Sequence, residues 1–130
     1  MRWLKILLAL NGAAFVLYGV MNLITPDSWY VAKGAPANEV DLARMIGILL
    51  LGLGVIQLGA WILEERLAVE MIAGVSLLLM AGWAAFGFTI QGSTYTDSFH
   101  TSAVATAAAY AVYAVLYAVV LYRERMAATA

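Results

Sequence analysis

The sequence of 130 residues has no cysteine, a single histidine and only 12% charged residues. Without cysteine, the chain forms no disulfide, no thiolate metal site and no thiol redox centre. Seven basic and eight acidic residues give a net charge of −1. This balance provides no basic surface, so we expect no nucleic-acid partner. HExxH, P-loop and nucleophile-elbow motifs are also absent. We therefore expect neither catalytic residues nor a bound metal.

Apolar residues make up 65% of the chain, and the mean hydropathy is +0.89. A soluble domain is nearer half apolar and about a quarter charged. Residues 46–63 carry no charge at all, and a run of that length is sufficient to span a bilayer. Four such runs predict spans at about residues 3–24, 42–63, 67–90 and 101–122. The predicted fold class is an all-α, integral membrane, antiparallel four-helix bundle, with residues 1–130 in one domain.

Basic residues near the ends of the spans predict the orientation, because they favour the cytoplasmic side of a membrane. Five lie on one side of the predicted bundle and two on the other: Arg2, Lys5, Arg66, Arg123 and Arg125 against Lys33 and Arg44. We therefore expect a prokaryotic plasma-membrane protein with both termini in the cytoplasm.

The connectors between the spans predict which spans are neighbours and where the second and fourth spans begin. The very short turn at residues 64–66 indicates that the second and third spans are antiparallel neighbours. Asp41 is the expected N-cap of the second span, and Asp97 or Ser98 that of the fourth, because such side chains accept a free backbone N–H.

Small residues form stripes on three of the spans, which is typical of membrane helices that pack closely. The predicted helix-packing residues are Gly12 and Gly19 in the first span, Gly47 and Gly54 in the second, and Ala107, Ala111, Ala114 and Ala118 in the fourth. We assign the alanine stripe to a partner subunit or to a second copy of the chain.

Polar side chains at similar depth predict a layer inside the bundle. Counted at 1.5 Å per residue, Asn11, Gln57, Tyr113 and Tyr117 lie roughly 7 to 13 Å from the cytoplasmic ends. Two interpretations remain open for this layer. It is either a ligand pocket or a set of interhelical hydrogen bonds, which contribute about 0.6 kcal/mol per pair.

A second polar group lies toward the other side of the membrane. Tyr18 and Asn22 share a face of the first span with Asn11, while Asp97 and His100 lie in the polar segment before the fourth span. An imidazole can bind a divalent metal or donate a hydrogen bond to a quinone carbonyl, although no metal-ligand spacing is present. The candidate ligand-binding residues are thus Asn11, Tyr18, Asn22, Gln57, Asp97, His100, Tyr113 and Tyr117.

The first half of the chain resembles a known family. A first span with Gly19 and a closing Pro26 precedes Arg44-Met45-Ile46-Gly47 and Leu51-Gly52-Leu53-Gly54. This arrangement is similar to the DoxX-like group of small four-helix membrane proteins. The resemblance implies a membrane subunit associated with quinone-linked oxidoreductases, with quinone as the possible cofactor. The fourth span carries no motif that matches this group.

Two classes of function follow. The leading hypothesis is a non-catalytic membrane subunit or self-associating bundle, with membrane lipids and a second copy or another subunit as partners. The alternative is a quinone- or lipid-binding subunit of an oxidoreductase, or a small-molecule transporter or channel. No ionisable residue lies deep in a span, which argues against a proton-driven antiporter.

Overall fold

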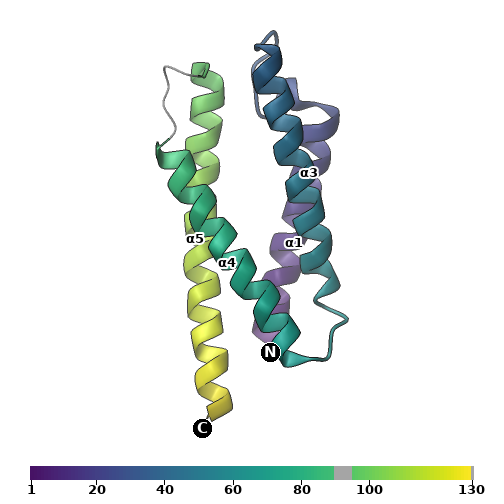
Figure 1. Ribbon diagram of the computed structural model, residues 1–130, viewed down its shortest axis with the longest axis vertical. Helices are drawn as coiled ribbons and strands as arrows, with labels where there is room; N and C mark the ends of the chain where they lie inside the picture. Colours follow the sequence, from purple (N-terminus) through teal and green to yellow (C-terminus); the bar gives the residue numbers. More distant parts are fainter. Residues whose placement is uncertain (90–94, 130) are drawn as a thin grey trace.

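The computed structural model describes residues 1–89 and 95–129, without the side chains of residues 28, 29 and 129. Its elements are α1 (Arg2–Ile24), α2 (Pro26–Trp29), α3 (Ala37–Gly59), α4 (Arg66–Thr89) and α5 (Asp97–Thr129). All of them except the short α2 are long and apolar enough to cross a membrane. These four helices alternate in direction, and both termini lie at the same end of the bundle (Figure 1). The predicted all-α four-helix bundle is confirmed.

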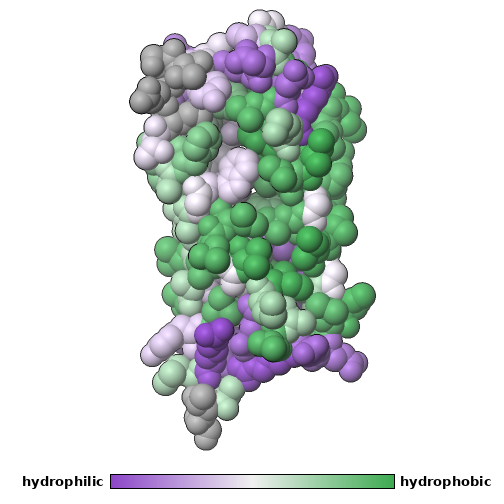
Figure 2. Space-filling view, in the orientation of Figure 1, coloured by the Kyte–Doolittle hydropathy of each residue, from purple (hydrophilic) through white to green (hydrophobic). Residues whose placement is uncertain are grey.

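The outer surface of the bundle has the polarity expected of a protein in a lipid bilayer. Figure 2 shows a hydrophobic middle zone between hydrophilic residues at both ends. Large apolar side chains point outward from each long helix, including Leu17, Ile48, Leu78 and Val112. Exposing so much apolar surface to water would be unfavourable, whereas lipid covers it without loss. The chain is a small four-helix membrane protein.

Several helix boundaries differ from those predicted. α3 begins at Ala37 after Pro36, whose φ of −55° already suits a helix start, so Asp41 lies inside the helix and is not its N-cap. Asp41 instead lies 3.8 Å from Arg44. α3 also ends at Gly59, before residue 63. The predicted end of the third span at residue 90 lies outside the described residues.

The start of α5 is capped by a residue that was not predicted. Thr96 Oγ1 accepts a hydrogen bond from the backbone N–H of Phe99 at 3.4 Å, so the proposed caps Asp97 and Ser98 are wrong. They occupy the first helical turn, where a negative side chain such as Asp97 is favourable. α5 also continues past residue 122, because the segment that follows is rich in the helix formers Ala, Arg, Glu and Met.

The bundle consists of two helical pairs. α1 packs along α3 and α4 packs along α5, whereas α3 and α4 diverge from the connector that joins them (Figure 1). The prediction that the second and third spans pack as neighbours is therefore wrong. The face of α3 that carries Gly47 and Gly54 is already occupied by α1, and the connector at residues 60–65 is long enough to let α4 tilt away.

Four glycines allow the backbones of α1 and α3 to pack directly against each other. A Cβ added to Gly12 would lie 2.9 Å from the carbonyl oxygen of Gly54, and one added to Gly19 would lie 2.8 Å from that of Gly47. The converse additions, at Gly54 and Gly47, would meet the carbonyl oxygens of Gly12 and Gly19 at 2.8 and 2.9 Å. Any side chain at these positions would push the backbones apart. Lys5 completes the pair by donating to the carbonyl oxygens of Trp61 and Leu63 at 3.2 and 2.5 Å.

The α4–α5 pair has its own close contact. A Cβ on Gly87 would lie 2.9 Å from the carbonyl oxygen of Ala103 and would also collide with the Ala107 side chain. Ala107 is fully buried. The first member of the alanine stripe therefore packs within the chain and is not available to a partner. Ala111 and Ala114 are half-buried, and Ala118 is exposed.

Candidate functional site

The polar layer toward the terminal end of the bundle connects all four long helices. Asn11 Nδ2 donates to Gln57 Oε1 and to the Tyr117 hydroxyl, both at 3.2 Å. Gln57 Nε2 donates in turn to Ser76 Oγ at 2.9 Å, and Ser76 Oγ donates to the carbonyl oxygen of Ile72 at 2.8 Å. Asn11, Gln57, Ser76 and Tyr117 are all fully buried.

These bonds give the layer a structural role. Three of the side chains predicted for it meet, and Ser76 joins them, while Tyr113 makes none of the layer's hydrogen bonds. Mutual hydrogen bonding leaves most of the polar atoms satisfied, as buried polar groups in a membrane require. Asn11 Oδ1 alone in this layer has no partner among the described residues. Neither Asn11 nor Gln57 lines any of the cavities described below.

Contacts at both ends also hold the two helical pairs together. At the terminal end, the N-terminal ammonium before α1 pairs with Glu124 of α5 and so joins the two pairs. Arg66 of α4 donates to the Glu124 carbonyl oxygen at 2.7 Å, a contact within the α4–α5 pair. At the opposite end, both carboxyl oxygens of Glu39 accept from Thr96, at 2.6 Å from its backbone N–H and at 2.7 Å from its hydroxyl. Glu39 is only 2% exposed, so these bonds are shielded from water.

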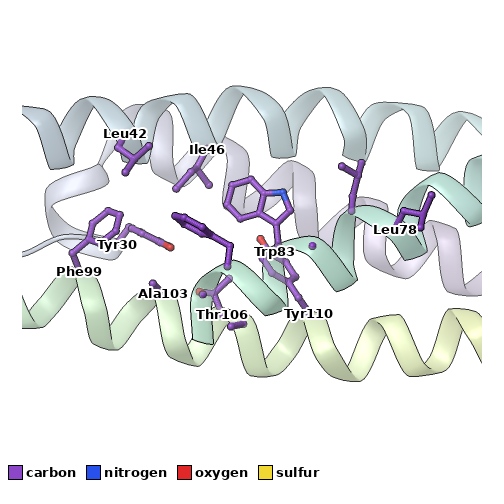
Figure 3. A pocket seen from close by; sticks show the side chains of 14 residues that line it. Tyr30, Leu42, Ile46, Leu78, Trp83, Phe99, Ala103, Thr106 and Tyr110 are labelled. Carbon is purple, nitrogen blue, oxygen red and sulfur yellow. The ribbon is translucent and has the colours of Figure 1, made fainter. Parts of the chain in front are cut away.

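A cavity of about 410 Å³ lies between the two pairs, in the half of the bundle away from the termini. Figure 3 shows Ile46 of α3 and Trp83 of α4 on one side of it, with Thr106 and Tyr110 of α5 on the other. Its wall consists of aromatic, aliphatic, glycine and threonine residues: Tyr30, Leu42, Ile46, Leu78, Leu79, Gly82, Trp83, Phe86, Gly87, Phe99, Ala103, Thr106, Ala107 and Tyr110. The volume is within the range of small-molecule sites.

A smaller cavity of about 240 Å³ lies next to the first. The two share the lining residues Tyr30, Ile46, Thr106 and Tyr110. The smaller cavity adds Tyr18 and Asn22 from α1, together with Leu50, Ala105 and Ala109. Asn22 is only 1% exposed, and its Oδ1 has no hydrogen-bond partner among the described residues.

Aromatic contacts hold the shared wall in place. Tyr110 packs edge-on against Phe15 and Trp83, with ring centroids 5.9 and 6.0 Å apart. Tyr30 packs edge-on against Phe99 at 5.3 Å, and Phe99 stacks on Tyr95 at 4.7 Å. Such pairs add specificity to apolar packing because their geometry is directional. The wall therefore joins α1, α4, α5 and the connector before α3.

Tyr30 contributes a protected hydroxyl to both cavities. Burial raises the pKa of the Tyr30 phenol above its usual value, and a side-chain hydrogen bond with Thr106 opposes this shift. A phenol is already uncharged at neutral pH and can donate or accept a hydrogen bond there, and the raised pKa extends this state to higher pH.

The remaining predicted ligand residues lie elsewhere. Tyr18 is 41% exposed at the border of the smaller cavity. Asp97 is exposed and His100 half-buried in the first turn of α5, and neither lines either cavity. Within the described part of the chain, no three side chains of His, Cys, Asp or Glu gather as a metal site would require. The structure thus brings together Asn11, Gln57 and Tyr117, and separately Tyr18 and Asn22.

Sequence reasoning missed most of the cavity wall. Trp83, Thr106 and Tyr110 were not among the predicted site residues. A signal existed on α5, because Phe99, Ala103, Thr106 and Tyr110 follow one another at steps of four, three and four, which places them on one helical face. A face with two aromatic rings and one hydroxyl beside small residues has the composition of a small-molecule site.

Known proteins give no further guide to this site. No protein-family model matches the chain, and neither a curated protein nor a solved structure does.

Proposed function

We propose that this membrane protein binds an uncharged, ring-containing small molecule that reaches the two adjacent cavities from the lipid. The observation that carries the proposal is the cavity of about 410 Å³, with its aromatic wall, between two helical pairs that are each tightly packed. Glycine contacts show that this chain packs helices closely where close packing is needed. The space between the pairs is thus a feature of their arrangement and not of loose packing throughout.

The lining defines the chemical class of ligand. Among the residues that the structure describes, no charged side chain lines either cavity. An ionised ligand would lose its hydration without gaining a counter-charge, which disfavours it strongly in an apolar site. Aromatic rings at Tyr30, Trp83 and Tyr110 favour stacking or edge contacts with a flat ligand. Quinones and ring-bearing lipids belong to this class, and the resemblance to the DoxX-like group agrees with it.

A pair of glycines on α4 provides a matched test. Gly82 lines the larger cavity and Gly74 lies outside both, while a Cβ at either position would meet nothing within 4 Å. Gly82→Leu places a side chain in the cavity, and Gly74→Leu makes the same change on the same helix away from it. Thermal unfolding is measured with a soluble naphthoquinone and with a membrane lipid extract.

The expected result separates binding from general stabilisation. A ligand at 100 times its dissociation constant stabilises the folded protein by about 2.7 kcal/mol. We expect this shift in the native chain and in Gly74→Leu, and its loss in Gly82→Leu. The absence of a shift with every ligand, or an equal shift in both variants, contradicts the proposal.

We also propose self-association through α5, on a separate observation. α5 exposes the small residues Ala105, Ala108 and Ala109, which allow another helix to approach closely. Ala105 and Ala109 also line the smaller cavity, so a helix packed here would lie against it. Ala108→Leu should lower the oligomer mass in detergent, whereas Ala81→Leu, at an exposed position on α4, should not. A monomeric native chain would exclude self-association and leave only a different subunit as partner.

A further inference from the structure

Asn22 is an acceptor that the protein itself does not satisfy. Its side chain is 1% exposed, it lines the smaller cavity, and its Oδ1 has no hydrogen-bond partner among the described residues. A buried acceptor without a partner loses the hydrogen bond it would make with water and gains nothing in return. Such a group within a membrane protein therefore calls for a donor from outside the chain.

The backbone around Asn22 limits its movement. A Cβ on Gly47 would lie 3.0 Å from the Asn22 Cβ, so Asn22 sits directly against the α3 backbone at the glycine contact. The α1–α3 pair thereby fixes the root of the side chain.

Asn11 shows what an amide with a purely structural role looks like in the same helix. Its Oδ1 also lacks a partner, but its Nδ2 donates to both Gln57 and Tyr117, and it lines neither cavity. The hydrogen bonds of Asn11 account for its presence. Asn22 differs from Asn11 because it lines the smaller cavity.

We infer that the ligand of the smaller cavity carries a hydroxyl group that donates a hydrogen bond to Asn22 Oδ1. The inference rests on the proposed binding function and narrows its ligand class to phenols and related ring alcohols. A ring compound of similar shape that offers only carbonyl or ether oxygens leaves Asn22 Oδ1 unpaired and binds more weakly. Tyr18, Tyr30 and Tyr110 supply the surrounding ring contacts.

The test compares two probes that differ in a single donor. 1-Naphthol carries a hydroxyl, and 1-methoxynaphthalene replaces its hydrogen with a methyl group. Binding is measured by equilibrium dialysis of the detergent-solubilised full chain against each probe, with empty micelles as the reference for partitioning. We expect the native chain to bind 1-naphthol about tenfold more tightly, the usual effect of one buried hydrogen bond.

Variants assign this preference to Asn22. Asn22→Leu keeps the approximate volume but removes the acceptor, so the affinity ratio should fall to about one, a tenth of the native preference. Asn11→Leu removes the other amide of α1 and should retain the native ratio even though it weakens the bundle. Circular dichroism checks that each variant is helical. Should Asn22→Leu fail to fold, Asn22→Ala makes a smaller change with the same expected loss.

The outcomes distinguish this inference from the function on which it rests. Equal affinity for the two probes in the native chain overturns the hydroxyl requirement and leaves the binding function standing. An affinity ratio that survives in the folded Asn22 variant shows that another residue accepts the hydroxyl. Failure of both probes to bind above the micelle reference counts against the cavities as a binding site altogether.

Discussion

Gly12 and Gly54 meet backbone to backbone: a Cβ on the first would lie 2.9 Å from the carbonyl oxygen of the second, and the converse distance is 2.8 Å. Seven residues further along α1, and seven back along α3, Gly19 and Gly47 repeat the same relationship. Two contacts of this kind determine both the register and the separation of the first helical pair. The cavities lie on the side of α3 that faces the second pair.

The glycine contacts predict a position-specific loss of stability. Gly54→Ala introduces a methyl group against the α1 backbone, and overpacking of this kind costs about 1 to 3 kcal/mol. Gly52→Ala on the same helix meets nothing within 4 Å and should leave stability unchanged or slightly higher. Unfolding free energies of the two variants in detergent provide the measurement. A similar loss in both would show that the close approach does not limit stability.

The buried polar layer predicts different effects for two tyrosines on α5. Tyr117→Phe removes the hydroxyl that accepts from Asn11, and a hydrogen bond of this kind in a membrane protein contributes about 0.6 kcal/mol. Tyr113→Phe removes a hydroxyl that takes no part in the layer. We expect a loss of stability for the first substitution only, measured as a change in unfolding free energy. Equal effects would contradict the assignment of the layer.

Glu39 and Thr96 should be energetically coupled across the two helical pairs. Hydrogen bonds to a carboxylate contribute about 1.5 to 3 kcal/mol when buried, and here both carboxyl oxygens are engaged. A double-mutant cycle of Glu39→Gln and Thr96→Val measures the interaction. Asp41→Asn, two residues along the same helix and exposed, provides the control and should change stability by less than about 0.5 kcal/mol. Additive effects of Glu39→Gln and Thr96→Val would exclude the coupling.

The basic residues at the terminal end predict a cytoplasmic location for both termini. The absence of native cysteine makes this simple to test with single cysteine variants. Asn38→Cys, at the exposed start of α3, should react with a membrane-impermeant maleimide in intact cells. Ala127→Cys, near the exposed end of α5, should react only after lysis. The opposite labelling pattern would reverse the orientation.

The sequence was sufficient to predict where the helices lie, but not which helices pack against each other. Long apolar runs identify the spans because bilayer thickness imposes a minimum length. The small-residue faces were also visible, and the equal spacing of Gly12 with Gly19 and of Gly47 with Gly54 is compatible with an antiparallel match. The short turn nevertheless suggested the wrong neighbours, because connector length limits how far apart two helix ends lie without determining how the helices tilt.

The site was only partly predictable, for a related reason. Depth counting placed Asn11, Gln57 and Tyr117 in one layer, and helical phase explains why Tyr117 joins it, since Tyr117 is seven residues from the buried Tyr110. Asn22 was also identified, as a candidate ligand-binding residue on the same face of the first span as Asn11. The cavities themselves depend on the angle between two helical pairs, and no local sequence pattern records that angle.

The two-pair arrangement has a consequence for how the protein is made. A ribosome delivers α1 and α3 before α4 and α5, and membrane helices associate after each has inserted. The glycine contacts lie wholly within this first half, so the earlier pair contains all the contacts that define its register. We therefore expect the later pair to pack against an α1–α3 pair that is already formed, through Ser76, Thr96 and Tyr117. On this order of synthesis, we expect the cavities to form last, where the two halves of the chain meet.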